Sequence, residues 1–128
     1  MKSGHCPCGS GKNYKECCKA YHKGSKNPPT ALLLMKARYA AYVKGKLDFL
    51  VDTWHPDTRP ENLTIDPDIK WIGLEIRSSE GGTQTDQDGI VTFYAKYSDA
   101  QGFLNGMTEK SLFTRIDDKW HYIKGDIS

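Results

Sequence analysis

All four cysteines of the 128-residue sequence lie in one stretch near its start, Cys6-Pro7-Cys8-Gly9-Ser10-Gly11-Lys12-Asn13-Tyr14-Lys15-Glu16-Cys17-Cys18. They form two close pairs, spaced C-x-C and C-C, with eight residues between the pairs. A soft metal ion takes four thiolates, or three thiolates and an imidazole, in a tetrahedron with metal–sulfur distances of about 2.3 Å. The spacing therefore predicts a metal centre, and its expected ligands are Cys6, Cys8, Cys17 and Cys18.

Other uses of four cysteines fit this stretch less well. Disulfides require an oxidising compartment, and the residues ahead of Cys6 contain no apolar run of the kind found in secretory signals. A redox pair usually has the spacing C-x-x-C, which is absent. His5 and His22 are alternative nitrogen ligands that would each replace one cysteine, and His22 is the better placed of the two.

The expected metal centre is structural. A segment of this length cannot bury a hydrophobic core of its own, and zinc binding in zinc-finger peptides supplies about 10–16 kcal/mol, which is enough to fold it. Four protein ligands close the coordination sphere, whereas a hydrolytic zinc keeps one position open for water. The closed site argues against a hydrolytic zinc, and no residue is assigned a catalytic role.

Charge is distributed unevenly along the chain. Residues 1–27 hold six lysines and one acidic residue, Glu16, whereas the remaining residues hold twelve basic and fifteen acidic groups. A small basic unit of this kind meets phosphate groups or acidic partner surfaces, or simply favours solubility. No apolar run approaches the ~20 residues that a membrane span needs. We therefore expect a soluble, cytoplasmic protein.

The middle of the chain predicts a linker and then helices. Residues 24–29 are polar apart from two prolines, which is typical of a linker. Thr30 is placed to cap a helix, and apolar residues recur at helical spacing over 31–44. A second, shorter helix is expected over 47–54, ended by the proline that follows. One more helical turn is expected within 60–66.

From residue 70 the pattern changes to the two-residue period of strands. Ile72, Leu74 and Ile76 share one face of the first strand, opposite Trp71. Further strands are expected over 91–97, 107–116 and 119–124, with a long loop over 78–89 and tight turns at 99–102 and 117–118. Helices followed by antiparallel strands argue for an α+β fold with the helices on one sheet face. The expected parts are a zinc knuckle over 1–23, a linker over 24–29 and an α+β body over 30–128.

Both the knuckle and the body resemble parts of a known family. Residues 6–18 are similar, at nearly every position, to the SEC-C zinc motif, C-P-C-G-S-G-K-x-Y-K-x-C-C. The body resembles that of the YchJ-like family of small bacterial proteins in the order of its motifs, which are Thr30-Ala31, Leu34-Met35, Arg38-Tyr39, Ala41-Tyr42-Val43, Thr53-Trp54-His55-Pro56, Trp71, Gly89-Ile90-Val91-Thr92-Phe93, Glu109-Lys110-Ser111-Leu112-Phe113 and Trp120-His121-Tyr122. The resemblance implies one structural Zn²⁺ on the four cysteines. It also implies a nuclear-transport-factor-2-like (cystatin-like) body, in which a helical hairpin packs on a strongly curved antiparallel sheet.

A cone-shaped sheet of this type encloses a pocket. The candidate pocket residues are Arg38, Tyr39, Tyr42, Trp54, His55, Trp71, Phe93, Glu109, Ser111 and Trp120. Glu109 shares a strand face with Met107 and Phe113, so we expect it to point inward. It would then act as a general base or ligand anchor, or form a structural pair with Arg38, unless it lies at a solvated strand end.

Two functions follow as hypotheses. The first is a zinc-dependent adaptor that docks on a protein partner through residues 1–23. The resemblance to the tail of the translocase ATPase SecA, which is associated with SecB, ribosomes and acidic phospholipid, implies a ribosome or another acidic surface as partner. RNA is a lower-ranked partner that would bind with a steep salt dependence. The second hypothesis is a small-molecule receptor or enzyme, which a hollow, polar pocket would favour and a ring-filled one would not.

Overall fold

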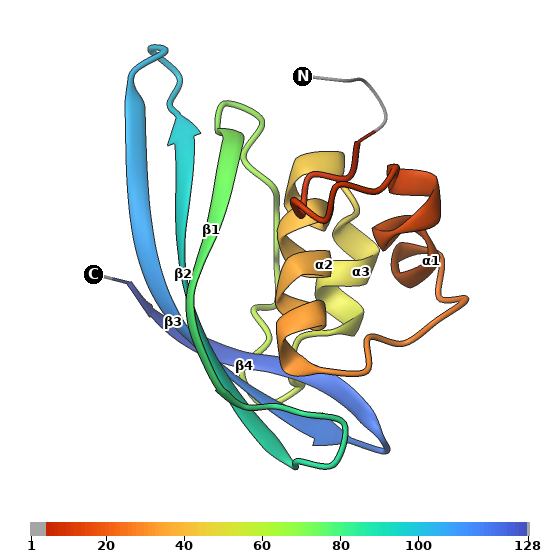
Figure 1. The fold of residues 1–128 in the computed structure, drawn as a ribbon. Helices are drawn as coiled ribbons and strands as arrows, with labels where there is room; N and C mark the ends of the chain where they lie inside the picture. Colours follow the sequence, from red (N-terminus) through yellow and green to blue (C-terminus); the bar gives the residue numbers. More distant parts are fainter. Residues whose placement is uncertain (1–4, 128) are drawn as a thin grey trace.

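The computed structural model describes residues 5–127, so residues 1–4 of the expected knuckle, and Ser128, lie outside the described residues. Its elements are the 3-10 helix η1 (Tyr14–Glu16), the α-helices α1 (Cys18–His22), α2 (Ala31–Lys44) and α3 (Leu47–Asp52), and the strands β1 (Lys70–Gly81), β2 (Asp88–Ser98), β3 (Leu104–Ile116) and β4 (Lys119–Ile127). Figure 1 shows three layers, because α2 and α3 cover one face of a curved sheet while the cysteine-rich segment and α1 pack on the far side of α2. The α+β fold predicted from the sequence is confirmed.

The long helix α2 begins and ends where its sequence predicts. The Thr30 side chain accepts a hydrogen bond from the backbone N–H of Leu33 at 3.1 Å, which satisfies one of the free donors at the helix start. Gly45 ends the helix in the left-handed conformation, with φ 73°, where a residue without Cβ is favoured.

The second helix is shorter than predicted. It ends at Asp52, because the next residues pair with the sheet edge instead. The N–H of Tyr122 donates to the Thr53 carbonyl at 2.8 Å, and the N–H of His55 donates to the Tyr122 carbonyl at 2.7 Å. This short bridge protects the backbone of the edge strand β4. The helical turn expected within 60–66 is wrong, since the structure has only a non-helical turn there.

The four strands form an antiparallel meander in the order β1-β2-β3-β4. The face predicted for β1 needs a correction. A bulge between Trp71 and Gly73 leaves Ile72 as the extra residue, so Trp71 joins the face of Leu74 and Ile76, while Ile72 is 56% exposed. The bulge turns the Trp71 ring toward the helices.

The first hairpin is longer in its strands than predicted. β1 and β2 pair as far as Gly81 and Gly89, so the connecting loop covers 82–87 rather than 78–89. Gly82 and Gly89 lie against Ala31 at the start of α2, where an added Cβ at either position would meet the Ala31 methyl group within 3.0 Å. The turn predicted at 117–118 is present, and both of its aspartates have positive φ.

The core lies between α2 and the inner face of the sheet. Leu34, Val91 and Phe113 are among its largest fully buried side chains, and Arg38 and Ser111 are buried polar residues within it. Within residues 5–127, no helix is both long and apolar enough to cross a membrane.

Candidate metal centre and body cavity

The four cysteine sulfurs converge at the start of the chain. They all lie within 4.8 Å of one another. The Sγ atoms of Cys8 and Cys17 are 3.6 Å apart, and those of Cys17 and Cys18 are 4.0 Å apart. In a tetrahedron with metal–sulfur distances of about 2.3 Å, neighbouring sulfurs are about 3.8 Å apart. None of these cysteines forms a disulfide, so the cluster has the donors and the spacing of a tetrathiolate metal site.

The local backbone explains how two pairs meet. Gly9 and Gly11 have φ near +84° and +83°, which only glycine adopts readily. They reverse the chain so that the N–H of Cys6 donates to the Lys12 carbonyl at 2.9 Å. The 3-10 helix η1 then leads into α1, whose first residue, Cys18, is buried beside the first pair. The sulfurs are therefore placed by backbone hydrogen bonds as well as by any metal.

The thiols influence one another strongly. A hydrogen bond from Cys18 is the main cause that lowers the pKa of Cys8 to about 4. The same interaction, together with burial, raises the pKa of Cys18, and burial raises the pKa of Cys6. Ionising one thiol thus opposes ionising its neighbours. A bound cation removes that conflict because it stabilises all four thiolates together.

His22 does not belong to the sulfur cluster. Its Nε2 lies 2.8 Å from the Ala37 carbonyl oxygen, and its Nδ1 lies 2.6 Å from the Tyr14 hydroxyl. Because a carbonyl can only accept, Nε2 carries the proton and Nδ1 accepts from the Tyr14 hydroxyl. Burial lowers the pKa of His22, which agrees with this neutral form. His22 therefore ties the knuckle to α2, and among residues 5–127 the metal-ligating group consists of the cysteines alone.

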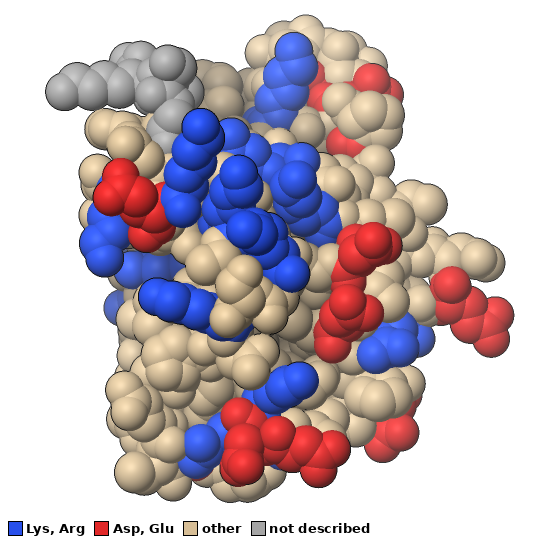
Figure 2. All heavy atoms as spheres, turned by 90° about the vertical axis from the view of Figure 1, so that its right-hand side faces the viewer, with Lys and Arg blue, Asp and Glu red and all other residues tan. Residues whose placement is uncertain are grey.

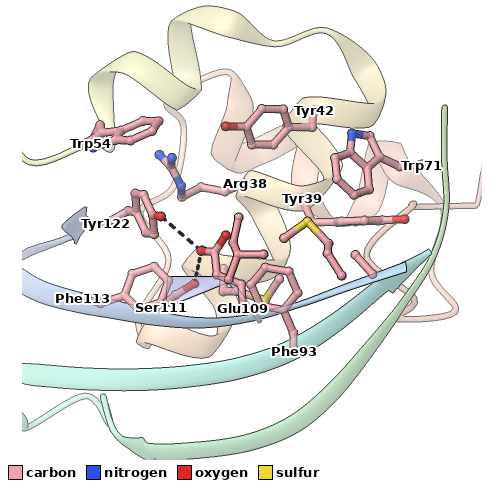
Figure 3. A pocket seen from close by; sticks show the side chains of 14 residues that line it. Arg38, Tyr39, Tyr42, Trp54, Trp71, Phe93, Glu109, Ser111, Phe113 and Tyr122 are labelled. Carbon is pink, nitrogen blue, oxygen red and sulfur yellow. Dashed lines mark hydrogen bonds between the residues drawn. The ribbon is translucent and has the colours of Figure 1, made fainter. Parts of the chain in front are cut away.

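The body contains a hollow cavity of about 240 Å³ between the helices and the sheet. Figure 3 shows its side chains pointing inward from α2, from the segment after α3 and from the strands. The residues that line it are Met35, Arg38, Tyr39, Tyr42, Trp54, Trp71, Phe93, Ala95, Met107, Glu109, Ser111, Phe113, Tyr122 and Ile127. This set includes every candidate pocket residue of the sequence analysis except His55 and Trp120.

His55 and Trp120 have other positions. The Nδ1 atom of His55 accepts the N–H of Asp57 at 3.0 Å in the turn after α3. Trp120 is buried nearer the β3–β4 turn, where its indole N–H donates to the Pro29 carbonyl at 3.2 Å and so holds the linker end against β4. Neither lines the cavity.

Several lining residues were missed by sequence reasoning, although some carried a signal. Phe113 shares the strand face of Glu109 and Ser111, and Met35 lies about one helical turn before Arg38. Tyr122 faces the cavity because it pairs with Phe113 in the regular register that runs back from the β3–β4 turn, on the same strand face as Trp120. The irregularity between the two strands comes after it, where Ile123 of β4 is the extra residue.

Arg38 provides a buried cation at the cavity wall. Its side chain is 5% exposed, and Nη1 donates to the Leu50 carbonyl at 2.9 Å and to the Thr53 hydroxyl at 2.7 Å. The guanidinium carbon lies 4.9 Å from the ring centre of Trp54 and 4.5 Å from that of Tyr122. Burial lowers the pKa of Arg38 to about 10, so it remains charged at neutral pH.

Glu109 faces the same cavity. Its Oε2 accepts hydrogen bonds from the Ser111 hydroxyl at 2.5 Å and from the Tyr122 hydroxyl at 3.1 Å. Burial and Glu109 together raise the pKa of Tyr122, so the phenol is protonated and donates. Of the alternatives considered for Glu109, the direct pair with Arg38 is wrong, because no ion pair within 4.0 Å joins them among the described residues.

These features define an α+β protein with a thiolate cluster at its start and a partly open, partly polar cavity in its body. Two family models match the sequence: the SEC-C motif over residues 6–20 and the YchJ middle NTF2-like domain over residues 30–125. The chain therefore belongs to the YchJ-like family, as its resemblance predicted.

Relatives and solved structures agree with this assignment. A UPF0225 protein of Streptomyces coelicolor is 40% identical over 98% of this chain and 98% of its own length. A UPF0225 protein of Chromobacterium violaceum is 44% identical over 94% of this chain and 90% of its own length. The solution structure of a SEC-C motif containing protein from Rhodopseudomonas palustris is similar with a TM-score of 0.83 and 27% identity, covering 94% of this chain and 96% of that one. The crystal structure of another, from Psychrobacter arcticus, is similar with a TM-score of 0.78 and 26% identity, covering 96% and 82%. The SEC-C match and the sulfur cluster together support metal binding.

Proposed function

We propose that the protein binds a small organic molecule in the body cavity and that a Zn²⁺ ion on the four cysteines stabilises its N-terminal end. The observation that carries the first part is Arg38, a buried cation in a largely apolar wall. Burying a guanidinium costs free energy unless its donors are satisfied. Among the described residues, only Nη1 of the guanidinium has hydrogen-bond partners, so the other nitrogens are left for a molecule that enters the cavity.

The size of the cavity suits a small ligand. Pockets for drug-sized molecules usually measure about 300–1,000 Å³ and combine apolar walls with a few polar groups. At about 240 Å³ this cavity lies just below that range, and half of the residues that line it are aromatic. A metabolite with one ring fits this space better than a nucleotide or a peptide.

A thermal-shift screen of metabolites on the zinc-loaded protein tests the proposal. A ligand present at a hundredfold its Kd adds about 2.7 kcal/mol of stability, which raises Tm by roughly 10 °C for a chain of this size. The shift should shrink in Glu109→Gln and persist in Glu75→Gln, a matched change on the outer sheet face where Glu75 pairs with Arg77. A screen without any such compound would count against a receptor role.

Zinc is the metal that best fits the cluster. Tetrathiolate tetrahedra are typical of structural zinc, and their closed coordination leaves no position for a substrate. Native mass spectrometry of the purified chain should show one zinc per molecule, and Cys8→Ser should lose it. A metal-free mass for the intact wild-type protein would refute this assignment.

A second candidate function rests on the charge of the outer face. Glu16 is the only acidic residue ahead of Asp48. The exposed lysines of the described part of this segment are Lys12, Lys15, Lys23, Lys26, Lys44 and Lys46. Figure 2 shows lysine and arginine side chains gathered on this face, and the Lys44 ammonium lies 4.7 Å from the ring centre of Tyr14, which brings the end of α2 beside the knuckle.

Such a basic face supports an adaptor that docks on an acidic protein or ribosomal surface. A pull-down should compare the wild type with Cys6→Ser combined with Cys8→Ser, and with Lys15→Glu combined with Lys23→Glu. Partners should be lost in both variants if a metal-organised basic face recognises them. The adaptor role fails if the captured proteins are the same in all three, and RNase-sensitive capture would indicate RNA instead.

A further inference from the structure

The cavity is lined by one positively charged and one negatively charged side chain, Arg38 and Glu109, which form no ion pair with each other among the described residues. Figure 3 shows the Arg38 side chain on the helix side of the cavity, with its guanidinium toward Trp54 and Tyr122, and the Glu109 carboxylate on the sheet side. They lie farther apart than 4.0 Å, yet each contributes to the electrostatic environment of the cavity. A gap of this kind leaves room for a ligand group between the two charges.

The donor side is held rigidly. Nη1 of Arg38 donates to Leu50 and Thr53, whereas Nε and Nη2 make no hydrogen bond within residues 5–127. Neither nitrogen is sealed off, because Trp54 holds the only fully buried, unpartnered side-chain nitrogen or oxygen of the described residues. The rings of Trp54 and Tyr122 lie against the guanidinium, so the remaining donors have a fixed direction.

The acceptor side is equally specific. Oε2 of Glu109 is occupied by Ser111 and Tyr122, and Oε1 has no partner among the described residues. A Cβ at Gly125 would collide with the Glu109 carboxyl group, so the glycine in β4 leaves the space that the Glu109 side chain occupies. Glu109 is thereby aimed at the cavity with one oxygen free.

The aromatic wall adds a shape requirement. The ring of Trp71 lies 6.1 Å from that of Tyr39 and 6.4 Å from that of Tyr42, measured between ring centres. Phe93 and Phe113 line the sheet side. Flat ligands stack well on such walls, and the apolar lining penalises any extra charge that has no partner.

Building on the proposed receptor function, we propose that the cavity selects neutral, planar molecules that carry an amide or lactam edge. The carbonyl oxygen of that edge accepts from Arg38, and its N–H donates to Oε1 of Glu109. The site already contains one positive and one negative charge. A carboxylate ligand would place a second negative charge beside Glu109, and a cation would repel Arg38, whereas the neutral edge satisfies both groups.

Four probes of related size separate these possibilities: benzamide, benzoate, benzamidinium and zwitterionic L-phenylalanine. Each is titrated into zinc-loaded, ¹⁵N-labelled protein, and Kd is taken from the shifts of the Trp54 and Trp71 indole signals. Benzamide should bind about ten- to a hundredfold more tightly than benzoate or benzamidinium, because each of these leaves one buried charged group without its hydrogen bond. In Glu109→Gln the order of benzamide and benzoate should reverse, and in Glu75→Gln it should stay as in the wild type.

The outcomes distinguish the ligand class from the receptor function itself. Tighter binding of benzoate, benzamidinium or L-phenylalanine to the wild type overturns the amide class while a receptor remains. If a metabolite from the thermal screen binds and benzamide does not, the amide class is likewise overturned while the receptor function remains. Silence from both the probes and the screen overturns the receptor function as well. The amide spectrum of Glu109→Gln shows whether the fold is retained, and Ser111→Ala, which removes one of the hydrogen bonds that hold Glu109, should weaken benzamide several-fold.

Discussion

Replacing His22 with phenylalanine tests how firmly the knuckle is attached to the body. The substitution keeps a ring against Phe49, whose centre lies 4.8 Å from that of His22. It removes the hydrogen bonds to Ala37 and to Tyr14. The Ala37 carbonyl keeps its helical partner and the Tyr14 hydroxyl can turn to water, so neither group is stranded. At about 1 kcal/mol for each hydrogen bond, the free energy of unfolding should fall by about 2 kcal/mol.

Urea denaturation of the zinc-loaded protein measures this loss, which corresponds to a decrease in Tm of roughly 6–10 °C for a chain of this length. Tyr14→Phe should cost about half as much, and the two changes together should cost less than the sum of the single changes because they share one bond. The His22→Phe protein should also release zinc to a chelator faster than the wild type. His121→Phe is the control, since within residues 5–127 the His121 ring makes a single, exposed hydrogen-bond contact, between its Nδ1 and the Lys119 carbonyl oxygen. A loss below about 0.5 kcal/mol for His22→Phe, within the range of ordinary surface changes, would refute the reasoning.

Three further outcomes are expected. Burial lowers the pKa of His22 in the folded protein. Its stabilising effect is therefore present above the pKa of the unfolded chain, near 6.5, and is lost as pH falls through the lower pKa of the folded protein. In denaturation series below about pH 6.5, the difference in free energy of unfolding between wild type and His22→Phe should narrow. Gly89→Ala should destabilise the protein by about 1–3 kcal/mol or abolish folding, because the added Cβ would lie 2.6 Å from the Gly82 Cα. An unchanged Tm in circular dichroism melting would contradict this prediction. Gly125→Ala should change the free energy of unfolding by no more than about 1 kcal/mol. It should still weaken the affinity for benzamide as Glu109→Gln does, because the added Cβ forces the flexible Glu109 side chain to move away. Unchanged affinity in the same titration would show that Glu109 does not contact the ligand.

Much of the fold follows from local rules that act within a few residues. The Thr30 cap and the left-handed Gly45 fix both ends of α2 regardless of what packs against it. The two aspartates at 117–118 likewise set the last hairpin through positive φ. The cysteine spacing is equally local, and it predicts a cluster that the structure brings within bonding distance of one ion.

The remaining features depend on contacts between distant segments. α3 ends early because Thr53 and His55 pair with β4, a strand more than sixty residues later. The bulge that turns Trp71 inward requires β2 as its partner, and strict alternation in the sequence therefore placed Trp71 on the wrong face. His22 shows the same limit, since its proximity to the cysteines in sequence suggested a ligand, whereas Ala37 determines its role.

The position of α2 between the metal cluster and the cavity constrains what each can do for the other. One side of the helix meets the knuckle through Ala37, and the other side carries Arg38, Tyr39 and Tyr42 into the cavity. Figure 1 shows the helix layer separating the cysteine-rich segment from the sheet. A metal bound by four sulfurs has no free position, and this one lies behind a helix, so it cannot touch a ligand in the cavity. In the proposed function, the metal would hold the outer side of α2 in place, while Arg38 and Glu109 would recognise the ligand in the cavity.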